Sequence, residues 1–240
     1  MTQLSFIALL ALVAVHVLAG RLRFLQGTPR SFWLSAAGGI SVAYVFLHLL
    51  PELAAGQGVM ARQSGGLFDA LEHHAYLVAW LGLTVFYGVE RAAMLSRTRS
   101  EVVDHAKGRG VFWLHIASFA PYNALVGYLL VRDVDAGREL LFFSIAMALH
   151  FLVTDGGLRA HHGRIYDSVG RWLLAFSVAL GGGIGYLLEL PPLAVSVLVA
   201  FLAGGIILNV LKEELPGERQ SRFSAFLLGG ACYAVLLTAY

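Results

Sequence analysis

Ala-Gly-Gly-Ile-Ser-Val-Ala-Tyr-Val-Phe-Leu-His-Leu-Leu-Pro-Glu, residues 37–52, is one of two related stretches that decide how this chain folds. The second, residues 203–216, reads Ala-Gly-Gly-Ile-Ile-Leu-Asn-Val-Leu-Lys-Glu-Glu-Leu-Pro. Both open with the same four residues, continue as an apolar helix and reach Leu-Pro beside an acidic residue, although the match requires a gap of one residue. Many secondary transporters contain repeats of opposite topology. If the two copies cross the membrane in opposite directions, the chain has the inverted repeat found in such transporters.

The composition is that of a membrane protein, with 58% hydrophobic and only 13% charged residues and a mean hydropathy of +0.72. Several stretches without Asp, Glu, Lys or Arg reach the roughly 20 residues that a helix needs to cross the hydrocarbon core. We predict an all-α membrane protein with one domain, residues 1–240, and eight transmembrane helices. Their expected positions are about 3–20, 31–52, 73–91, 110–131, 138–158, 171–189, 192–212 and 222–239.

Basic residues predict the orientation, because cytoplasmic loops carry an excess of Lys and Arg. With the N-terminus outside, the outer loops hold only Arg62, Arg132 and Arg138 of the 17 basic residues. The second helix then runs outward and the seventh inward, which makes the two copies an inverted repeat. The first span is not a cleavable signal peptide, since its basic residues follow the apolar run. We predict a protein of the cell (inner or plasma) membrane with both termini outside.

The remaining composition limits the chemistry and the partners. Cys232 is the only cysteine, which excludes an intrachain disulfide and a cysteine-based metal site. The net charge of +2 arises from inner-loop arginines, so no nucleic-acid partner is expected. The expected partners are the lipid bilayer and a small cation or other small solute, and a homodimer is compatible with the sequence. Glycines of the sixth and eighth spans should allow close helix packing: Gly181, Gly182, Gly183, Gly185, Gly229 and Gly230.

Polar groups at membrane depth are costly, so those in the fourth span are candidate functional residues. His115, Ser118 and Tyr122 share one helix face, and Asn123 lies beside it. Pro121 cannot donate to the carbonyl of residue 117 and should kink the helix. These groups could form a small-cation site or, alternatively, only hydrogen bonds between helices.

The fifth span carries a matching set of polar residues. His150 and Thr154 follow Met147 at helical spacing, with Asp155 adjacent. An imidazole and a carboxylate at this depth could bind metal or relay protons. In the alternative interpretation, Asp155 only pairs with Arg159 at the inner edge.

Further titratable groups lie at the ends of the spans. His48 and Glu52, one turn apart around Pro51, form a possible cation-capture site at the outer face, which Glu72, His73 and His74 could join. His161, His162 and Asp167 fall in an expected inner loop and are interpreted as solvated. Lys212, Glu213 and Glu214 are interpreted as an interfacial cluster at the inner end of the seventh span.

The segment Gly38–Glu52 is very similar to the second helix of the ZIP (Zrt/Irt-like) divalent-metal transporters. The third span, from Tyr76 to Glu90, ends in a glutamate as that family's third helix commonly does, and the seventh span resembles its counterpart. The resemblance implies eight helices in a 3+2+3 inverted arrangement. It also implies a metal site between helices four and five, built from a His-x-x-Pro-Glu/Asp-Gly type of motif in each.

The chain departs from this pattern at the expected ligands. Around Pro121, Ser118 stands where the family has His, Tyr122 replaces the acid and Asn123 replaces Gly. His150 fits the first ligand position of the fifth span, but Thr154 replaces its acid. A dehydrated divalent ion needs anionic ligands. We therefore predict no required cofactor and no binuclear centre, and at most one weakly bound divalent ion, such as zinc, that depends on His150 with Asp155 or on backbone carbonyls freed near Pro121.

Three functions are compatible with these observations. The first is a divergent ZIP-like transporter of a divalent metal cation or another small solute. The second is a protein of the same fold that no longer transports and acts as a sensor, scaffold or subunit. The third is an intramembrane hydrolase using Ser118, His115, His150 and Asp155. Because no metal-ligand spacing recurs on several helices, we favour the transporter and expect no enzymatic activity.

Overall fold

The computed structural model describes residues 2–21, 31–62, 75–100, 105–132, 138–214 and 222–238. Within these ranges the chain is helical and contains no strand, which confirms the predicted all-α class. Five helices are long and apolar enough to cross a membrane: Phe32–Met60, Gly110–Arg132, Leu140–His162, Tyr166–Leu187 and Pro192–Lys212. Two shorter apolar helices lie at Gln3–Leu18 and Phe223–Thr238.

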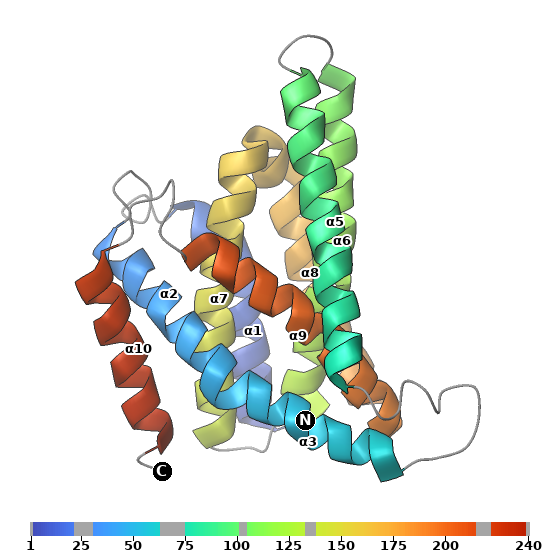
Figure 1. The fold of residues 1–240 in the computed structure, drawn as a ribbon, viewed down its shortest axis with the longest axis vertical. Helices are drawn as coiled ribbons and strands as arrows, with labels where there is room; N and C mark the ends of the chain where they lie inside the picture. Colours follow the sequence, from blue (N-terminus) through green and yellow to red (C-terminus); the bar gives the residue numbers. More distant parts are fainter. Residues whose placement is uncertain are drawn as a thin grey trace.

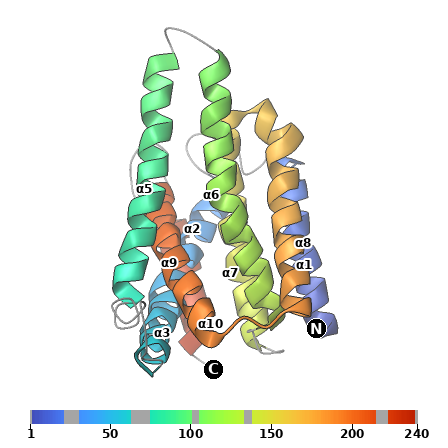
Figure 2. The same ribbon diagram turned by 90° about the vertical axis from the view of Figure 1, so that its right-hand side faces the viewer.

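The helical elements follow one another along the chain (Figure 1). They are α1 (Gln3–Leu18), η1 (Ala19–Arg21), α2 (Phe32–Tyr44), η3 (Val45–Leu49), α3 (Leu50–Arg62), α5 (Ala75–Ser100), α6 (His105–Arg132), α7 (Arg138–His162), η4 (Tyr166–Gly170), α8 (Arg171–Leu187), α9 (Pro192–Glu214) and α10 (Phe223–Thr238). α1 begins and α10 ends at the same end of the molecule (Figure 2), as an even number of membrane passes requires.

The second helix does not end at Pro51. α2, η3 and α3 continue without a break from Phe32 to Arg62, so the predicted end at residue 52 is wrong. Proline cannot donate to the carbonyl four residues earlier, and its ring crowds that carbonyl. Here a π-helical turn, in which Leu50 N–H donates to Val45 O, lies just before Pro51. The wider turn accommodates the ring, so the helix continues past the proline.

The two Ala-Gly-Gly-Ile copies are sites of close helix crossing. A Cβ on Gly39 of α2 would lie 1.9 Å from Phe226 O of α10. A Cβ on Gly204 of α9 would lie 1.9 Å from Ala79 O of α5. Because a side chain at either position would collide with a backbone carbonyl, only glycine permits these contacts. The repeated sequence therefore forms two corresponding contacts, α2 with α10 and α5 with α9.

Glycines also join α6 to α8. A Cβ on Gly181 would lie 1.7 Å from Ala124 O, and one on Gly127 would lie 2.1 Å from Val178 O. The packing role predicted for the other glycines is confirmed for Gly182, Gly185, Gly229 and Gly230, which all meet a neighbouring helix. It is wrong for Gly183, which has nothing within 4 Å because it faces away from the bundle.

The loop predicted after residue 158 is mostly helical. α7 continues to His162, and Gly163 then adopts the left-handed conformation with φ of +54°. Glycine has no Cβ penalty there, so the chain turns within one residue and becomes helical again before η4. This short connection places Tyr166 in the protein interior with no exposed surface.

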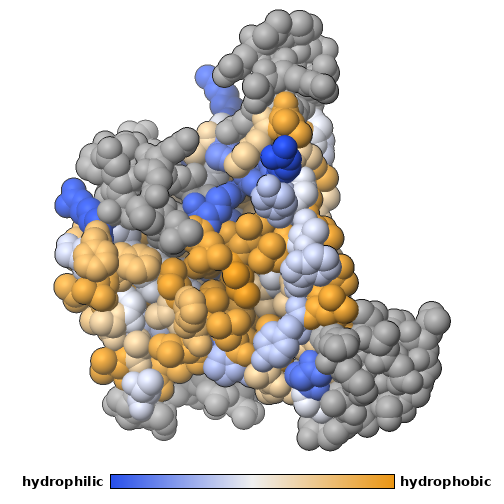
Figure 3. Space-filling view, viewed as in Figure 1, coloured by the Kyte–Doolittle hydropathy of each residue, from blue (hydrophilic) through white to orange (hydrophobic). Residues whose placement is uncertain are grey.

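The face seen in Figure 3 is largely apolar away from the ends of the bundle, as expected for a lipid-facing bundle. Trp33, Trp80 and Phe176 are among the large side chains that point outward and are more than half exposed. The buried polar groups of the described residues come instead from α1, α2, α6, α7, α8 and α9. Polar groups inside and apolar groups outside is the arrangement that a bilayer favours.

Candidate functional site

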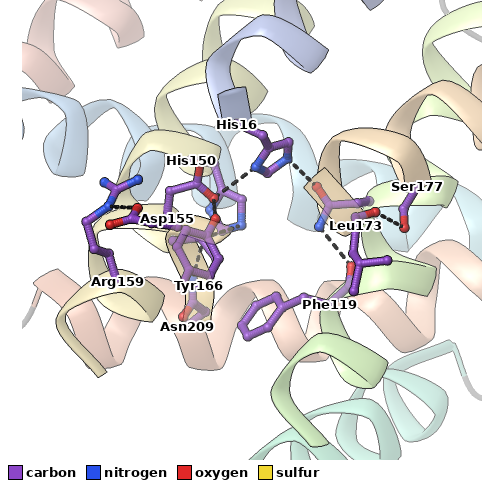
Figure 4. A network of polar contacts seen from close by, with 12 residues as sticks. His16, Phe119, His150, Asp155, Arg159, Tyr166, Leu173, Ser177 and Asn209 are labelled. Carbon is purple, nitrogen blue, oxygen red and sulfur yellow. Dashed lines mark hydrogen bonds and ion pairs between the residues drawn. The ribbon is translucent and has the colours of Figure 1, made fainter. Parts of the chain in front are cut away.

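A fully buried hydrogen-bond network joins α1, α6 and α7 (Figure 4). His16 Nδ1 lies 2.9 Å from Asp155 Oδ1, and His16 Nε2 lies 2.7 Å from Asn123 Oδ1. The Asn123 amide nitrogen donates to Phe119 O at 2.8 Å, which orients its oxygen toward the imidazole. The two ring nitrogens of His16 therefore each lie within hydrogen-bond distance of an oxygen from a different helix.

Asp155 has a second partner from the turn after α7. Tyr166 donates its hydroxyl to Asp155 Oδ1, while Oδ2 is buried without a hydrogen-bond partner among the described residues. The predicted pair between Asp155 and Arg159 is wrong, because Arg159 Nε donates instead to Asp167 at 2.7 Å. Asp155 is thus held by His16 and Tyr166 rather than placed at the membrane edge.

His150 lies in a separate polar cluster one turn earlier in α7. Its Nε2 is 3.5 Å from Thr154 Oγ1, which accepts a hydrogen bond from Asn209 Nδ2 of α9 at 3.2 Å. On its other side, the Tyr122 ring meets the His150 ring edge-to-face, with 5.5 Å between centroids. All four side chains are buried. The cluster therefore connects α6, α7 and α9 through polar groups.

A cavity of about 150 Å³ extends from Tyr122 to the exposed Glu52. Its polar lining consists of Tyr44, His48, Glu52 and Tyr122, and the rest is apolar. Tyr44 and His48 are stacked with 5.1 Å between ring centroids. The positions of His115 and Asp155 in their spans predict a polar cleft between the fourth and fifth helices that opens toward the cytoplasm. Among the described residues, His115 instead contacts Glu90 and His162, and Asp155 contacts His16 and Tyr166. The cavity instead reaches the end of the bundle that the sequence assigns to the outside.

A charged cluster lies on the opposite side of Asn209. Lys212 Nζ is 3.0 Å from Glu90 Oε2, and His115 Nε2 is 3.6 Å from the same oxygen, an ion-pair distance too long for a hydrogen bond. His115 Nδ1 is 2.7 Å from His162 Nε2. A small pocket of about 20 Å³ has a polar lining of Glu90, His115, Ser118, Asn209 and Lys212, and the rest of its lining is apolar.

The predicted inner-loop residues are therefore not simply solvated. His162 lies at the end of α7 and contacts His115, and Asp167 accepts from Arg159. His162 reaches His115 because α7 continues as a helix to residue 162. Glu72, His73, His74 and the side chains of Glu213 and Glu214 lie outside the described residues.

The polar residues of the fourth and fifth spans, which were predicted to form one site, belong to separate groups in the structure. Ser118 is partly buried, and its hydroxyl donates back to Leu114 O at 2.9 Å. Asn123 and Asp155 belong to the His16 network, while Tyr122, His150 and Thr154 form the neighbouring cluster with Asn209. His115 turns toward Glu90. Sharing a helix face places residues on one side of a helix, but it does not select which neighbouring helix each one meets.

Sequence reasoning missed two central residues. His16 is an imidazole within an apolar first span, and the rule applied to the fourth and fifth spans would have identified it. Tyr166 gave no comparable signal, because it lies in a segment interpreted as a loop and tyrosine is common at membrane interfaces.

The described residues contain no group of three or more His, Cys, Asp or Glu side chains arranged to hold a metal ion. The groups best placed to contact a passing cation are Glu52 and His48 at the cavity mouth, and His150 with Thr154 beyond Tyr122. The sequence matches no protein-family model, and no curated protein is significantly similar to it.

Proposed function

We propose that the protein is a ZIP-like membrane transporter that moves a small cation, of which a divalent metal ion is the form implied by the sequence resemblance. The observation that carries the proposal is a line of polar side chains through the bundle. It begins at Glu52, His48 and Tyr44, passes Tyr122 and His150, continues through Thr154 and Asn209, and reaches Glu90, His115 and Lys212.

This line has the properties of a closed transport path. The outer cavity ends at the Tyr122 ring, and the inner pocket begins at Asn209. His150 and Thr154 connect Tyr122 to Asn209 through side-chain contacts, so opening the path would need a local rearrangement rather than unfolding of a core. Two partly separate compartments on either side of a short barrier are what alternating access requires.

The helix contacts support a 3+2+3 inverted arrangement. Exchanging the first three helices with the last three converts the α2–α10 contact into the α9–α5 contact. Both occur, and both are made through glycines of the repeated sequence. The α1–α8 and α2–α9 contacts each map onto themselves under the same exchange, and both are present. A pseudo-twofold axis in the membrane plane accounts for all four contacts.

Flux into proteoliposomes tests the transport proposal. The purified protein should admit at least one of a panel of divalent metal ions and monovalent ammonium ions faster than protein-free liposomes do. Asn209→Leu should slow this flux severalfold, because it removes the polar link between the barrier and the inner pocket. Ser144→Ala is the control, since that hydroxyl donates to Leu140 O of its own helix and Ser144 lines neither the outer cavity nor the inner pocket. If no ion of the panel enters faster than in protein-free liposomes, the transport proposal is wrong.

One observation favours a protein of this fold that does not transport. Asp155, the only acidic side chain at depth in α7, is occupied by His16 and Tyr166 and is not directed at the cavity. A sensor or scaffold subunit would retain the fold and show no flux of any ion. No contact among the described residues favours a hydrolase, since the Ser118 hydroxyl donates to the backbone carbonyl of Leu114.

A further inference from the structure

The outer cavity is an unusual place for a metal ion. Its wall is mostly apolar and consists of Leu49, Leu125, Val126, Leu129, Phe143, Met147, Val195, Val199, Leu202 and Ile206. Among the described residues, Glu52 is the only carboxylate in the lining, and it lies where the cavity meets the exposed surface. A divalent ion that lost its water here would have one anionic ligand, which is far too little to replace its hydration.

The same lining suits an organic cation. An apolar cavity of about 150 Å³ is large enough for a molecule the size of benzene. Near its mouth, the stacked rings of Tyr44 and His48 lie close to the charge of Glu52. Aromatic faces and one carboxylate are the groups that recognise an ammonium ion, and an apolar wall takes the hydrocarbon that carries it.

The deep end of the cavity has no free charge to attract a second ionic group. The Tyr122 hydroxyl donates to Met147 Sδ at 3.6 Å, so the phenol is directed at the wall. The polarity of the site therefore runs from charged at Glu52 to apolar at Met147. An occupant that matches this gradient has one cationic end and one small hydrocarbon end.

We propose that this cavity binds a monovalent organic ammonium ion with a compact hydrocarbon body, its ammonium group at Glu52 and its hydrocarbon against Met147 and Val199. The binding stands on the cavity alone. Only the further step, that such an ion is the transported cation, rests on the transport function proposed above.

Equilibrium binding of cyclohexylammonium to the protein in lipid nanodiscs tests the proposal. Cyclohexanol has a similar shape without the charge, and cyclohexanecarboxylate has the opposite charge. We expect saturable binding of the ammonium ion, binding of cyclohexanol weaker by about tenfold, and no saturable binding of the carboxylate. Empty nanodiscs correct for partition into lipid.

Three variants locate the binding. Glu52→Gln should weaken cyclohexylammonium about tenfold and leave cyclohexanol unchanged. Glu189→Gln, which alters an exposed carboxylate paired with Arg132 outside the cavity lining, should leave both unchanged. Val199→Phe should fill the cavity and remove binding of both compounds. The unfolding temperature of each variant without ligand reports whether the protein is still folded.

Two results would overturn the proposal: equal affinity for cyclohexylammonium and cyclohexanol, or ammonium affinity that Glu52→Gln does not change in a folded protein. The flux assay is read separately. Ammonium binding without flux of any ion would support the cavity ligand and contradict the transport function. Metal flux without ammonium binding would support the transport function and contradict the cavity ligand.

Discussion

His16 joins α1 to α6 and α7 through two hydrogen bonds, and its ring also packs against Phe151. His16→Ala leaves both Asp155 and Asn123 without that partner. We expect a loss of about 2 kcal/mol of stability, measured as a lower unfolding temperature in detergent. Ser118→Ala is the matched control and should change stability by less than about 0.5 kcal/mol. Equal effects of the two substitutions would show that the network contributes nothing specific.

A second prediction at the residue scale concerns metal binding by His150. We expect weak zinc-dependent thermal stabilisation at neutral pH that His150→Ala removes. Lowering the pH through the range in which imidazole gains a proton should also remove it, because a protonated ring cannot bind metal. Tyr122→Glu and Thr154→Asp should strengthen it by supplying the acids that the family pattern contains. Tight zinc binding that persists in His150→Ala would place the metal elsewhere, with His48 and Glu52 the first candidates.

The sequence identified most of the polar residues, but not their partners. His48, Glu52, Tyr122, His150 and Thr154 all line or adjoin the proposed path. Spacing offers Arg159 as one alternative partner for Asp155, but in the structure Asp155 contacts His16, which is 139 positions away. Helical spacing is a local property, whereas the choice between two partners is made by tertiary packing.

At the scale of helices, the glycine crossings predict a contrast between two positions. Gly204→Ala places a methyl group against Ala79 O and should destabilise the protein by about 1–3 kcal/mol. Gly88→Ala, in a helix with nothing within 4 Å of the added atom, should be neutral or stabilise by about 0.5–1 kcal/mol. Thermal unfolding in detergent measures both. A Gly204→Ala protein as stable as the original would mean that α5 and α9 do not meet as described.

Helix ends were the least predictable feature at this scale. Leu-Pro is a common place for a helix to end, yet η3 carries α2 past Pro51 into α3. Nothing in the local sequence distinguishes a proline that ends a helix from one that follows a π-helical turn. The extension of α7 to His162 was missed for a similar reason, since polar residues at a membrane edge fit a loop and a helical turn equally well.

At the scale of the whole molecule, the termini give a direct test of topology. The structure places the start of α1 and the end of α10 at one end of the bundle, and the basic residues predict that this end is outside. Reporter fusions to the two termini should therefore both report the outer side of the membrane. Fusions that report opposite sides would contradict the even number of passes, and two cytoplasmic termini would invert the orientation.

The glycine crossings also have a mechanical consequence. Where two backbones touch, sliding one helix along the other would drive a side chain into a carbonyl. We therefore expect the pair α2 and α10, and the pair α5 and α9, each to move as a rigid unit. Interfaces filled by longer side chains, such as those around Tyr122, Leu202 and Ile206, can instead yield by changes of rotamer. We expect conformational change to be concentrated between these two helix pairs, where the cavity lies.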